Sequence, residues 1–185
     1  RLSEAKRILK SNSVRSILLD DEGQLWMGIS TYGFGVEDRR TGKFTHHGQM
    51  PDFSSYRGIS TVMSIMQSPS TAHIWIGVYN GGAYEIDQSA PVGKRVKAHN
   101  SSNAPWMCNS CIYYICEDSK QNLWFATKSG ISMRAADGTS VRFDSLKVGD
   151  VAVRDMVVMQ LVEGRDGEMW LASNTCLLYT SPSPR

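Results

Sequence analysis

The sequence predicts an all-β protein assembled from repeats of four short strands. Tryptophan recurs at intervals of 49, 49 and 46 residues, and each Trp follows an aliphatic residue and precedes a Gly or Ala by two positions. A run of β-branched, aliphatic or aromatic residues, typical of a strand, lies before each of these segments. A period of about 20 to 50 residues indicates units that stack on their neighbours to bury a shared core. The four repeated positions are Trp26, Trp75, Trp124 and Trp170.

Each repeat is expected to begin with a β-hairpin. Its first strand is predicted at 14–19, 62–66, 112–116 and 157–162. A tight turn, such as residues 20–23 or 165–167, leads into the Trp strand, and its Gly supplies the positive φ that hairpin turns often need. Both strands are apolar at nearly every position, which indicates that neighbouring units cover both faces of the sheet. We expect the first strand to line the central axis.

Two further strands complete each unit. One or two glycines follow the Trp strand, and short segments at 34–38, 83–86 and 131–134 predict a third strand. More polar segments at 43–46, 95–98 and 141–143 predict a fourth. Four antiparallel strands per repeat, with polarity rising outward, match one blade of a β-propeller. The predicted fold is therefore a partial β-propeller of about three and a half four-stranded antiparallel blades, forming an open arc with unpaired strand edges.

The period divides the chain into six segments. Residues 1–10 are the end of a preceding blade or a connection, and 11–59, 60–108 and 109–155 are blade repeats 1 to 3. Residues 156–175 begin a truncated repeat 4. Residues 176–185 resemble the translation of a transposase adapter used in sequencing libraries, with a Ser/Pro linker as the alternative. The chain is accordingly expected to be a piece of a longer protein.

The four Trp residues are predicted to form the structural core of the repeat. A buried Trp ring covers about 150 to 250 Å², and its indole N–H usually needs a hydrogen-bond partner. The Gly or Ala two positions later points to the same side of the strand, where it leaves room for the ring or the adjoining sheet.

No catalytic residue is predicted. Asp20, Asp21, Glu22 and Asp166 could supply the paired carboxyl groups of a glycosidase. Their position in hairpin turns favours hydrogen bonds to their own backbone instead. No Ser, His and Asp set has a recognisable catalytic spacing.

No metal or cofactor is predicted either. Cys108 and Cys111 have the spacing of half a zinc site, but no second pair follows. The apolar setting of Cys111 and Cys116 suits buried thiols, and a disulfide stays open for an oxidising compartment. His46 and His47 are adjacent on a predicted outer strand, so they should point to opposite faces as surface residues.

The sequence also argues against a dinucleotide-binding site, a nucleic-acid-binding surface and a membrane span. The segment 33–35 has two glycines but lacks the third Gly and the helix of a dinucleotide fingerprint. The net charge of +2, with acids and bases interspersed, gives no basic stripe for nucleic acid. No apolar run approaches the roughly 18 residues of a membrane span.

Polar and aromatic residues in the connections are the candidate ligand-binding groups. Loops at one end of a propeller surround the mouth of its channel, and loops on rigid scaffolds often carry binding residues. Aromatic, Arg and Asn side chains suit a sugar, although Trp106 could equally pack between blades. Tyr113 and Tyr114, on an inner strand, are expected to be core. The candidates are Tyr32, Tyr56, Arg57, Tyr79, Asn80 and Trp106.

The segment 14–28, which reads VRSILLDDEGQLWMG, resembles the two-component regulator propeller repeat. The copy around Trp124 fits well, whereas the copy around Trp75 has one extra residue and lacks the acidic turn. This resemblance implies the extracytoplasmic, periplasmic sensor region of a hybrid two-component protein with an intracellular histidine kinase. It also implies an oligosaccharide ligand and a homodimer in the intact protein, held to the membrane through other parts of the parent.

Two alternatives to a sensor remain open at the level of sequence. A propeller glycoside hydrolase or lyase would need acid and base groups that converge at the channel mouth. A propeller with a purely structural, protein-interaction role would need neither those groups nor a ligand. The parent protein is expected to be a histidine kinase, but this chain itself is expected not to be an enzyme.

Overall fold

The computed structural model describes residues 13–56, 58–174 and 177–179. These residues form short strands and three 3-10 helices, η1 (His47–Gln49), η2 (Pro51–Phe53) and η3 (Val153–Asp155). The strands are β1 (Val14–Leu19), β2 (Gln24–Ile29), β3 (Gly33–Asp38), β4 (Lys43–His46), β5 (Val62–Gln67), β6 (Ile74–Val78), β7 (Gly82–Ile86), β8 (Val96–His99), β9 (Ile112–Glu117), β10 (Leu123–Thr127), β11 (Ile131–Arg134), β12 (Ser140–Arg142), β13 (Lys147–Val148), β14 (Val151–Ala152), β15 (Val158–Glu163), β16 (Met169–Ser173) and β17 (Leu177–Tyr179).

The strands pair in the predicted order within each repeat. β1 to β4, β5 to β8 and β9 to β12 form three four-stranded antiparallel sheets, here called blades 1 to 3. β15, β16 and β17 form a three-stranded sheet, here called blade 4. A hairpin of β13 and β14, which the sequence did not predict, lies between blades 3 and 4. Of the tail 176–185, only Leu177–Tyr179 is among the described residues.

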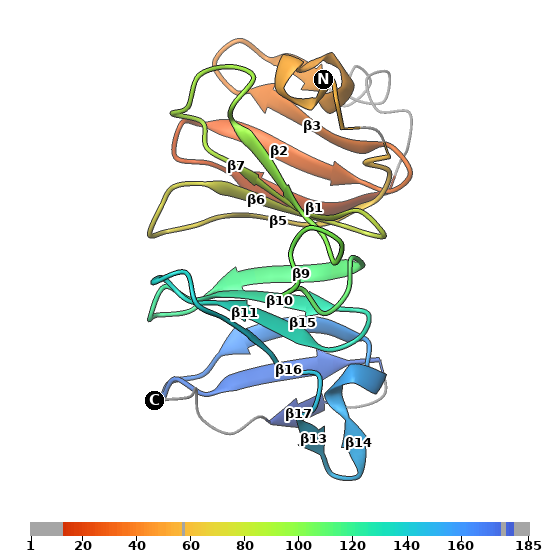
Figure 1. Ribbon diagram of the computed structural model, residues 1–185. Helices are drawn as coiled ribbons and strands as arrows, with labels where there is room; N and C mark the ends of the chain where they lie inside the picture. Colours follow the sequence, from red (N-terminus) through yellow and green to blue (C-terminus); the bar gives the residue numbers. More distant parts are fainter. Residues whose placement is uncertain (1–12, 57, 175–176, 180–185) are drawn as a thin grey trace.

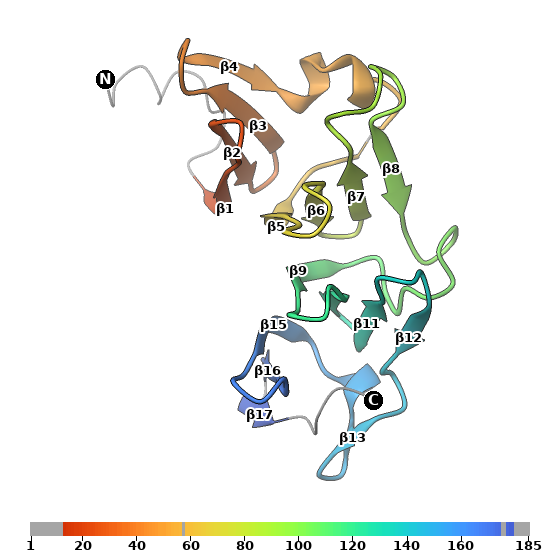
Figure 2. The same cartoon turned by 90° about the vertical axis from the view of Figure 1, so that its left-hand side faces the viewer.

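The blades follow one another along an open arc, as predicted. Figure 1 shows them stacked in chain order, and the turned view of Figure 2 shows the curvature. The first strands pack on each other in succession, β1 on β5, β5 on β9 and β9 on β15, whereas β4, β8 and β12 form the outer edges of their sheets. The first strand of each blade therefore lines the inside of the arc.

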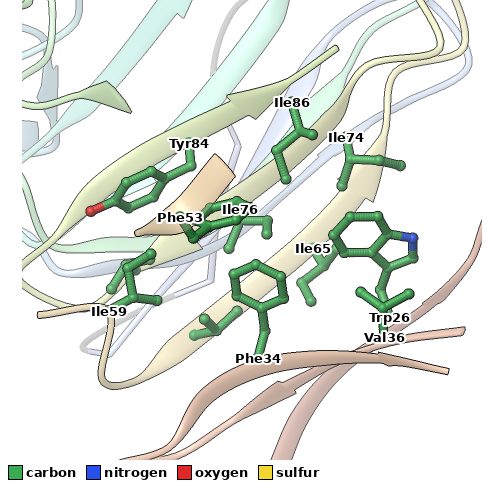
Figure 3. Close-up of a cluster of buried hydrophobic side chains, with 12 residues drawn as sticks. Trp26, Phe34, Val36, Phe53, Ile59, Ile65, Ile74, Ile76, Tyr84 and Ile86 are labelled. Atoms are coloured by element: carbon green, nitrogen blue, oxygen red, sulfur yellow. The ribbon is translucent and has the colours of Figure 1, made fainter. Parts of the chain in front are cut away.

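Buried side chains join each blade to the next. Between blades 1 and 2, Trp26 and Phe34 face the aliphatic residues of β5, β6 and β7 (Figure 3). Trp75 packs against Ile112, Ile115 and Phe125 of blade 3. Trp124 packs within the cluster that contains the buried residues of blade 4. Each of these three Trp rings is thus part of an interface between blades and is almost fully buried.

The small residue two positions after the Trp makes room for the adjoining sheet. A Cβ at Gly28 would lie 2.7 Å from Cγ1 of Val62, and a Cβ at Gly77 would lie 2.8 Å from Cγ2 of Ile112. Both contacts are shorter than carbon atoms tolerate, and both partners begin the inner strand of the next blade. Of the two predicted reasons for a small residue here, room for the Trp ring or room for the adjoining sheet, the structure supports the adjoining sheet.

Blade 1 departs from the expectation that both faces of its inner strands are covered. Ile17 is 68% exposed and Leu19 is 60% exposed. Their side of blade 1 does not face blade 2, whose contacts are made by Trp26, Phe34 and Val36. Trp26, Trp75 and Trp124 each point toward the next blade along the chain. Trp170 of blade 4 is only half-buried, because the described residues include no blade after blade 4. An apolar pattern predicts burial only where a neighbouring blade is present.

Candidate functional site

The acidic turn of blades 1 and 3 holds the repeated Trp in place. Asp20 is buried, and its Oδ2 accepts a hydrogen bond from Trp26 Nε1 at 2.8 Å. Its Oδ1 accepts from the backbone N–H groups of Glu22 and Gln24 at 3.0 and 2.8 Å. Asp118 repeats the arrangement with Trp124 Nε1 at 2.8 Å. These carboxylates are structural, as the turn position predicted, and they also supply the indole partner.

Blades 2 and 4 depart from this arrangement. In blade 4, Gly164 stands six residues before Trp170, and the indole N–H is instead donated to Glu168 Oε1 at 3.0 Å. In blade 2, Ser68 takes the place of the aspartate, and its hydroxyl donates to Glu117 Oε2 of blade 3. Trp75 Nε1 is buried and has no acceptor among the described residues.

The inner face of the arc carries a concave cavity of about 680 Å³. Its wall is formed by the four inner strands and presents hydroxyl, phenol, amide, guanidinium and thioether groups. The residues that give it this character are Arg15, Ser16, Met63, Ser64, Tyr113, Tyr114, Met159 and Gln160. A wall with apolar rings and several hydrogen-bonding groups can bind a polar ligand that also has apolar faces.

Tyr113 and Tyr114, both half-buried, line the concave cavity. Tyr114 also packs against the buried cluster between blades 3 and 4, as predicted for a core residue, whereas Tyr113 belongs to no buried cluster, contrary to the prediction. Alternate residues of a strand point to opposite sides, yet in a strand at the inner edge of a blade some of them face the channel instead of a neighbouring sheet. Burial raises the pKa of Tyr113, with Tyr79 and Cys111 adding to the effect. Its phenol is therefore a neutral donor and acceptor at neutral pH.

Tyr79 and Asn80 lie where the inner hairpin of blade 2 ends, beside this cavity. The Tyr79 ring meets that of Tyr113 edge to face, with centroids 6.0 Å apart, and Tyr79 is exposed. Asn80 is also exposed, has a φ of 60°, and its Oδ1 contacts Cys111 Sγ. The structure thus brings two of the six candidate residues together with Tyr113.

Tyr32 lies in the corresponding turn of blade 1. Its ring is 4.2 Å from that of His46, whose Nε2 is 2.7 Å from the Tyr32 carbonyl oxygen. His46 caps η1, and the chain turns at this point, so His47 is buried against Phe34 instead of lying on the surface. The two imidazoles are 4.1 Å apart and do not point to opposite faces, contrary to the prediction.

Tyr56 and Trp106 occupy equivalent places between blades. Tyr56 packs on Phe53 and Tyr84, and its hydroxyl donates to the Val96 carbonyl oxygen at 3.0 Å. Trp106 packs against His99 and Phe125, with ring centroids at 5.8 and 5.2 Å. Both rings take part in inter-blade packing, the alternative considered for Trp106. Arg57 lies outside the described residues.

A charge cluster that sequence reasoning missed joins the outer strands of blade 2 to blade 3. Glu85 accepts from His73 Nδ1 and His99 Nε2, each at 3.0 Å, and Arg134 NH1 lies 3.8 Å from Glu85 Oε2. Burial alone would raise the pKa of Glu85, but the hydrogen bonds from His99 and His73 and the charges of His99 and Arg134 lower it to about 2. Glu85 is therefore ionised throughout the physiological range.

The three cysteines among the described residues, Cys108, Cys111 and Cys116, are free thiols, and burial raises the pKa of Cys116 to about 12. Within residues 13–56, 58–174 and 177–179, no group of three or more His, Cys, Asp or Glu side chains is placed to hold a metal ion. The same residues contain no helix long and apolar enough to cross a membrane.

Part of this site carried a signal in the sequence. Asp20 and Asp118 stand six residues before their Trp, a spacing that could have identified the indole acceptor. The role of Tyr113 carried no such signal, because an inner strand of a blade reads as uniformly buried whether a residue faces the channel or a sheet.

Comparison with known proteins agrees with this architecture. The model of the two component regulator propeller family matches residues 8–31 and 107–129, the hairpins of blades 1 and 3. This confirms the resemblance predicted from the Trp segments. A comparison with curated proteins finds no match.

Solved structures show the same fold. The extracellular domain of a putative hybrid two-component system from B. thetaiotaomicron is 24% identical with a TM-score of 0.64, over 86% of this chain and 20% of that one. A second such domain from the same organism is 20% identical with a TM-score of 0.66, over 89% and 22% of the two chains. A virginiamycin B lyase from Staphylococcus aureus is 16% identical with a TM-score of 0.60, over 88% and 50%. The chain spans about a fifth of the two extracellular domains, and these likenesses show the propeller fold.

Proposed function

We propose that this chain is part of the sensor propeller of a hybrid two-component protein, lies on the extracytoplasmic side of the membrane, and binds an oligosaccharide. The repeat match at 8–31 and 107–129 supports the sensor role. The concave cavity of about 680 Å³ on the inner face of the arc carries the ligand-binding part of the proposal.

The proposed ligand contacts follow from the chemistry of that wall. Tyr79 and Tyr113 offer ring faces and edges for the C–H faces of a sugar. Arg15 and Gln160 offer donors and an acceptor for hydroxyl groups. Asn80, exposed next to Tyr79 in the chain, would contact a ligand that extends beyond the cavity. Tyr32, Tyr56, Arg57 and Trp106 remain predicted contacts, and the packing of Tyr56 and Trp106 makes Tyr79 and Tyr113 the better first targets.

The proposed mechanism is a population shift. A ligand can change kinase output only by binding one arrangement of the paired sensor regions more tightly than the other. We propose that the intact protein is a homodimer in which ligand on the propellers favours one arrangement. The chain itself then supplies recognition, and the histidine kinase of the parent supplies catalysis.

Ligand binding can be tested on the 185-residue chain by isothermal titration with a panel of plant and host-glycan oligosaccharides. We expect saturable binding of at least one glycan and about a tenfold loss of affinity for Tyr113→Ala, because an aromatic contact contributes about 0.5 to 1.5 kcal/mol beyond its buried area and about 1.4 kcal/mol corresponds to tenfold. Tyr84→Phe, which changes a buried tyrosine of the cluster between blades 1 and 2, is the control and should retain the affinity. A panel without a ligand, or equal affinities for Tyr113→Ala and the original chain, would reject this site.

A further inference from the structure

A second cavity, of about 220 Å³, lies between blades 2 and 3. The turn of blade 2, at Ser68, Ser70 and Thr71, forms one wall together with Trp75 and Glu85. Arg134 of blade 3 lines the other side. The cavity has a mixed polar and apolar lining and shares no lining residue with the concave cavity of the inner strands.

One indole donor at this cavity lacks the acceptor that its counterparts have. Trp26 and Trp124 each donate to the aspartate of their own turn, and Trp170 donates to Glu168. Trp75 is 1% exposed and its Nε1 has no partner among the described residues. A buried donor without an acceptor costs stability, and a bound group that accepts from Trp75 Nε1 would remove this cost.

Ser68 does not fill the role of the missing aspartate. It lies at the equivalent place in the turn, but its hydroxyl contacts Glu117 of blade 3 and Thr71 Oγ1, the latter at 2.8 Å. A serine side chain is also shorter than an aspartate. The place that a carboxylate occupies in blades 1 and 3 is therefore not taken by a carboxylate of the blade 2 turn.

Arg134 provides a second donor at the cavity. Its NH1 lies 3.8 Å from Glu85 Oε2, beyond hydrogen-bond distance, so this contact does not use the guanidinium N–H groups. Each oxygen of Glu85 already accepts one hydrogen bond, Oε1 from His73 and Oε2 from His99, at 3.0 Å each. The Arg134 side chain is 31% exposed and can turn toward a ligand.

We propose that this cavity binds a small carboxylate, such as an acidic monosaccharide or a short organic acid. One carboxylate oxygen accepts from Trp75 Nε1, as the aspartate oxygen does in blades 1 and 3, and the other accepts from Arg134. Hydrogen bonds of this kind to a charged acceptor are stronger than neutral ones, and the low exposure of Trp75 strengthens them further. The hydroxyls of Ser70 and Thr71 lie at the same wall and suit the hydroxyl groups of a sugar acid. This site is independent of the proposed sensor role.

The experiment is a titration of the ¹⁵N-labelled 185-residue chain followed through its assigned indole N–H resonances. The probes are sodium acetate and sodium glucuronate at constant ionic strength, with glucose as the neutral control of similar size. We expect the Trp75 resonance to shift and saturate with both carboxylates and to ignore glucose, while the Trp26 and Trp124 resonances stay in place.

Two arginine variants separate this site from general charge effects. Arg134→Gln should weaken the acetate affinity by about tenfold or more, because it removes the charged partner at the cavity rim. Arg142→Gln makes the same change in net charge but lies on β12, paired with Asp144, and should leave the affinity unchanged. A Trp75 resonance that does not respond to carboxylates, or equal affinities for the two variants, would overturn the proposal.

Discussion

At the scale of single residues, the partner of the repeated indole distinguishes one blade from the next. Trp26 and Trp124 are held by an aspartate six residues earlier, Trp170 by a glutamate two residues earlier, and Trp75 by neither. The regular spacing of Trp thus conceals different local chemistry. The sequence identified the rings as structural from their period and showed that the copy around Trp75 lacks the acidic turn, but the contact of Ser68 with Glu117 of blade 3 depends on how the blades pack.

Replacing individual Trp rings with Phe should reveal this difference. Trp124→Phe removes ring area and a hydrogen bond to buried Asp118, whereas Trp75→Phe removes ring area and a donor that has no partner in the part of the chain the structure describes. We expect Trp124→Phe to lower the free energy of unfolding by about 1 to 3 kcal/mol more than Trp75→Phe. Urea unfolding of both variants measures this difference. Equal losses in the two variants would show that the Asp118 bond contributes nothing.

Truncating the ring is a separate test of burial. Trp75→Ala removes a side chain that is 1% exposed and packs against Phe125 and Ile112. The free energy of unfolding should fall by about 3 to 5 kcal/mol, as for other buried aromatic side chains. An unchanged urea midpoint in Trp75→Ala would contradict the role of the ring in the interface.

Glu85 should make the stability of the protein depend on pH in the acid range. Its pKa is lowered from 4.5 to about 2 in the folded chain, so the unfolded chain binds the proton more readily. The stabilisation is therefore fully present above about pH 4.5 and is lost as the pH falls toward 2, a contribution of about 3 kcal/mol. Glu85→Gln should lose stability at pH 7 and show a flatter acid dependence in urea unfolding. An acid profile identical to that of the original chain would be inconsistent with this pKa.

At the scale of the element, the room between one blade and the inner strand of the next depends on the small residue that follows each Trp. The inner strand of blade 2 begins with Val62 against Gly28, and that of blade 3 begins with Ile112 against Gly77, whereas blade 3 has Ala126 at the same position. Strand positions could be predicted from the sequence, because turns and apolar runs are local. The hairpin of β13 and β14 and the 3-10 helices could not, because short connections are shaped by the blades on either side.

Exchanging Gly and Ala two positions after the Trp tests how closely the neighbouring blade approaches. Gly77→Ala would place a Cβ 2.8 Å from Ile112 Cγ2 and should cost about 1 to 3 kcal/mol. Ala126→Gly, at the matched position of blade 3, should cost about 1 kcal/mol by adding backbone freedom and a small void. Thermal or urea unfolding of the pair measures both costs. A stabilised Gly77→Ala would show that blades 2 and 3 are not in close contact there.

At the scale of the whole molecule, the open arc leaves an apolar blade face uncovered. Ile17 and Leu19 of blade 1 are 68% and 60% exposed, and they lie on the face that blade 2 does not cover. The open arc was predictable from the number of repeats. The exposure of these apolar residues was not, because their pattern is that of a covered blade.

This uncovered face should promote self-association of the isolated chain. Leu19→Lys should reduce association in sedimentation velocity while changing the free energy of unfolding by no more than about 0.5 kcal/mol, as expected for an exposed site. Val92→Lys is the matched control, because Val92 is 61% exposed in the connection between β7 and β8. If both variants reduce association equally, the effect comes from added charge and not from the open blade face.

The measurement that tests the central claim most directly is long-read sequencing of the gene that encodes this chain. The sensor proposal predicts that the coding sequence departs from residues 176–185 and continues through further Trp repeats into a membrane-spanning segment and a histidine kinase. A reading frame that keeps this tail and then reaches a stop codon would contradict the proposal.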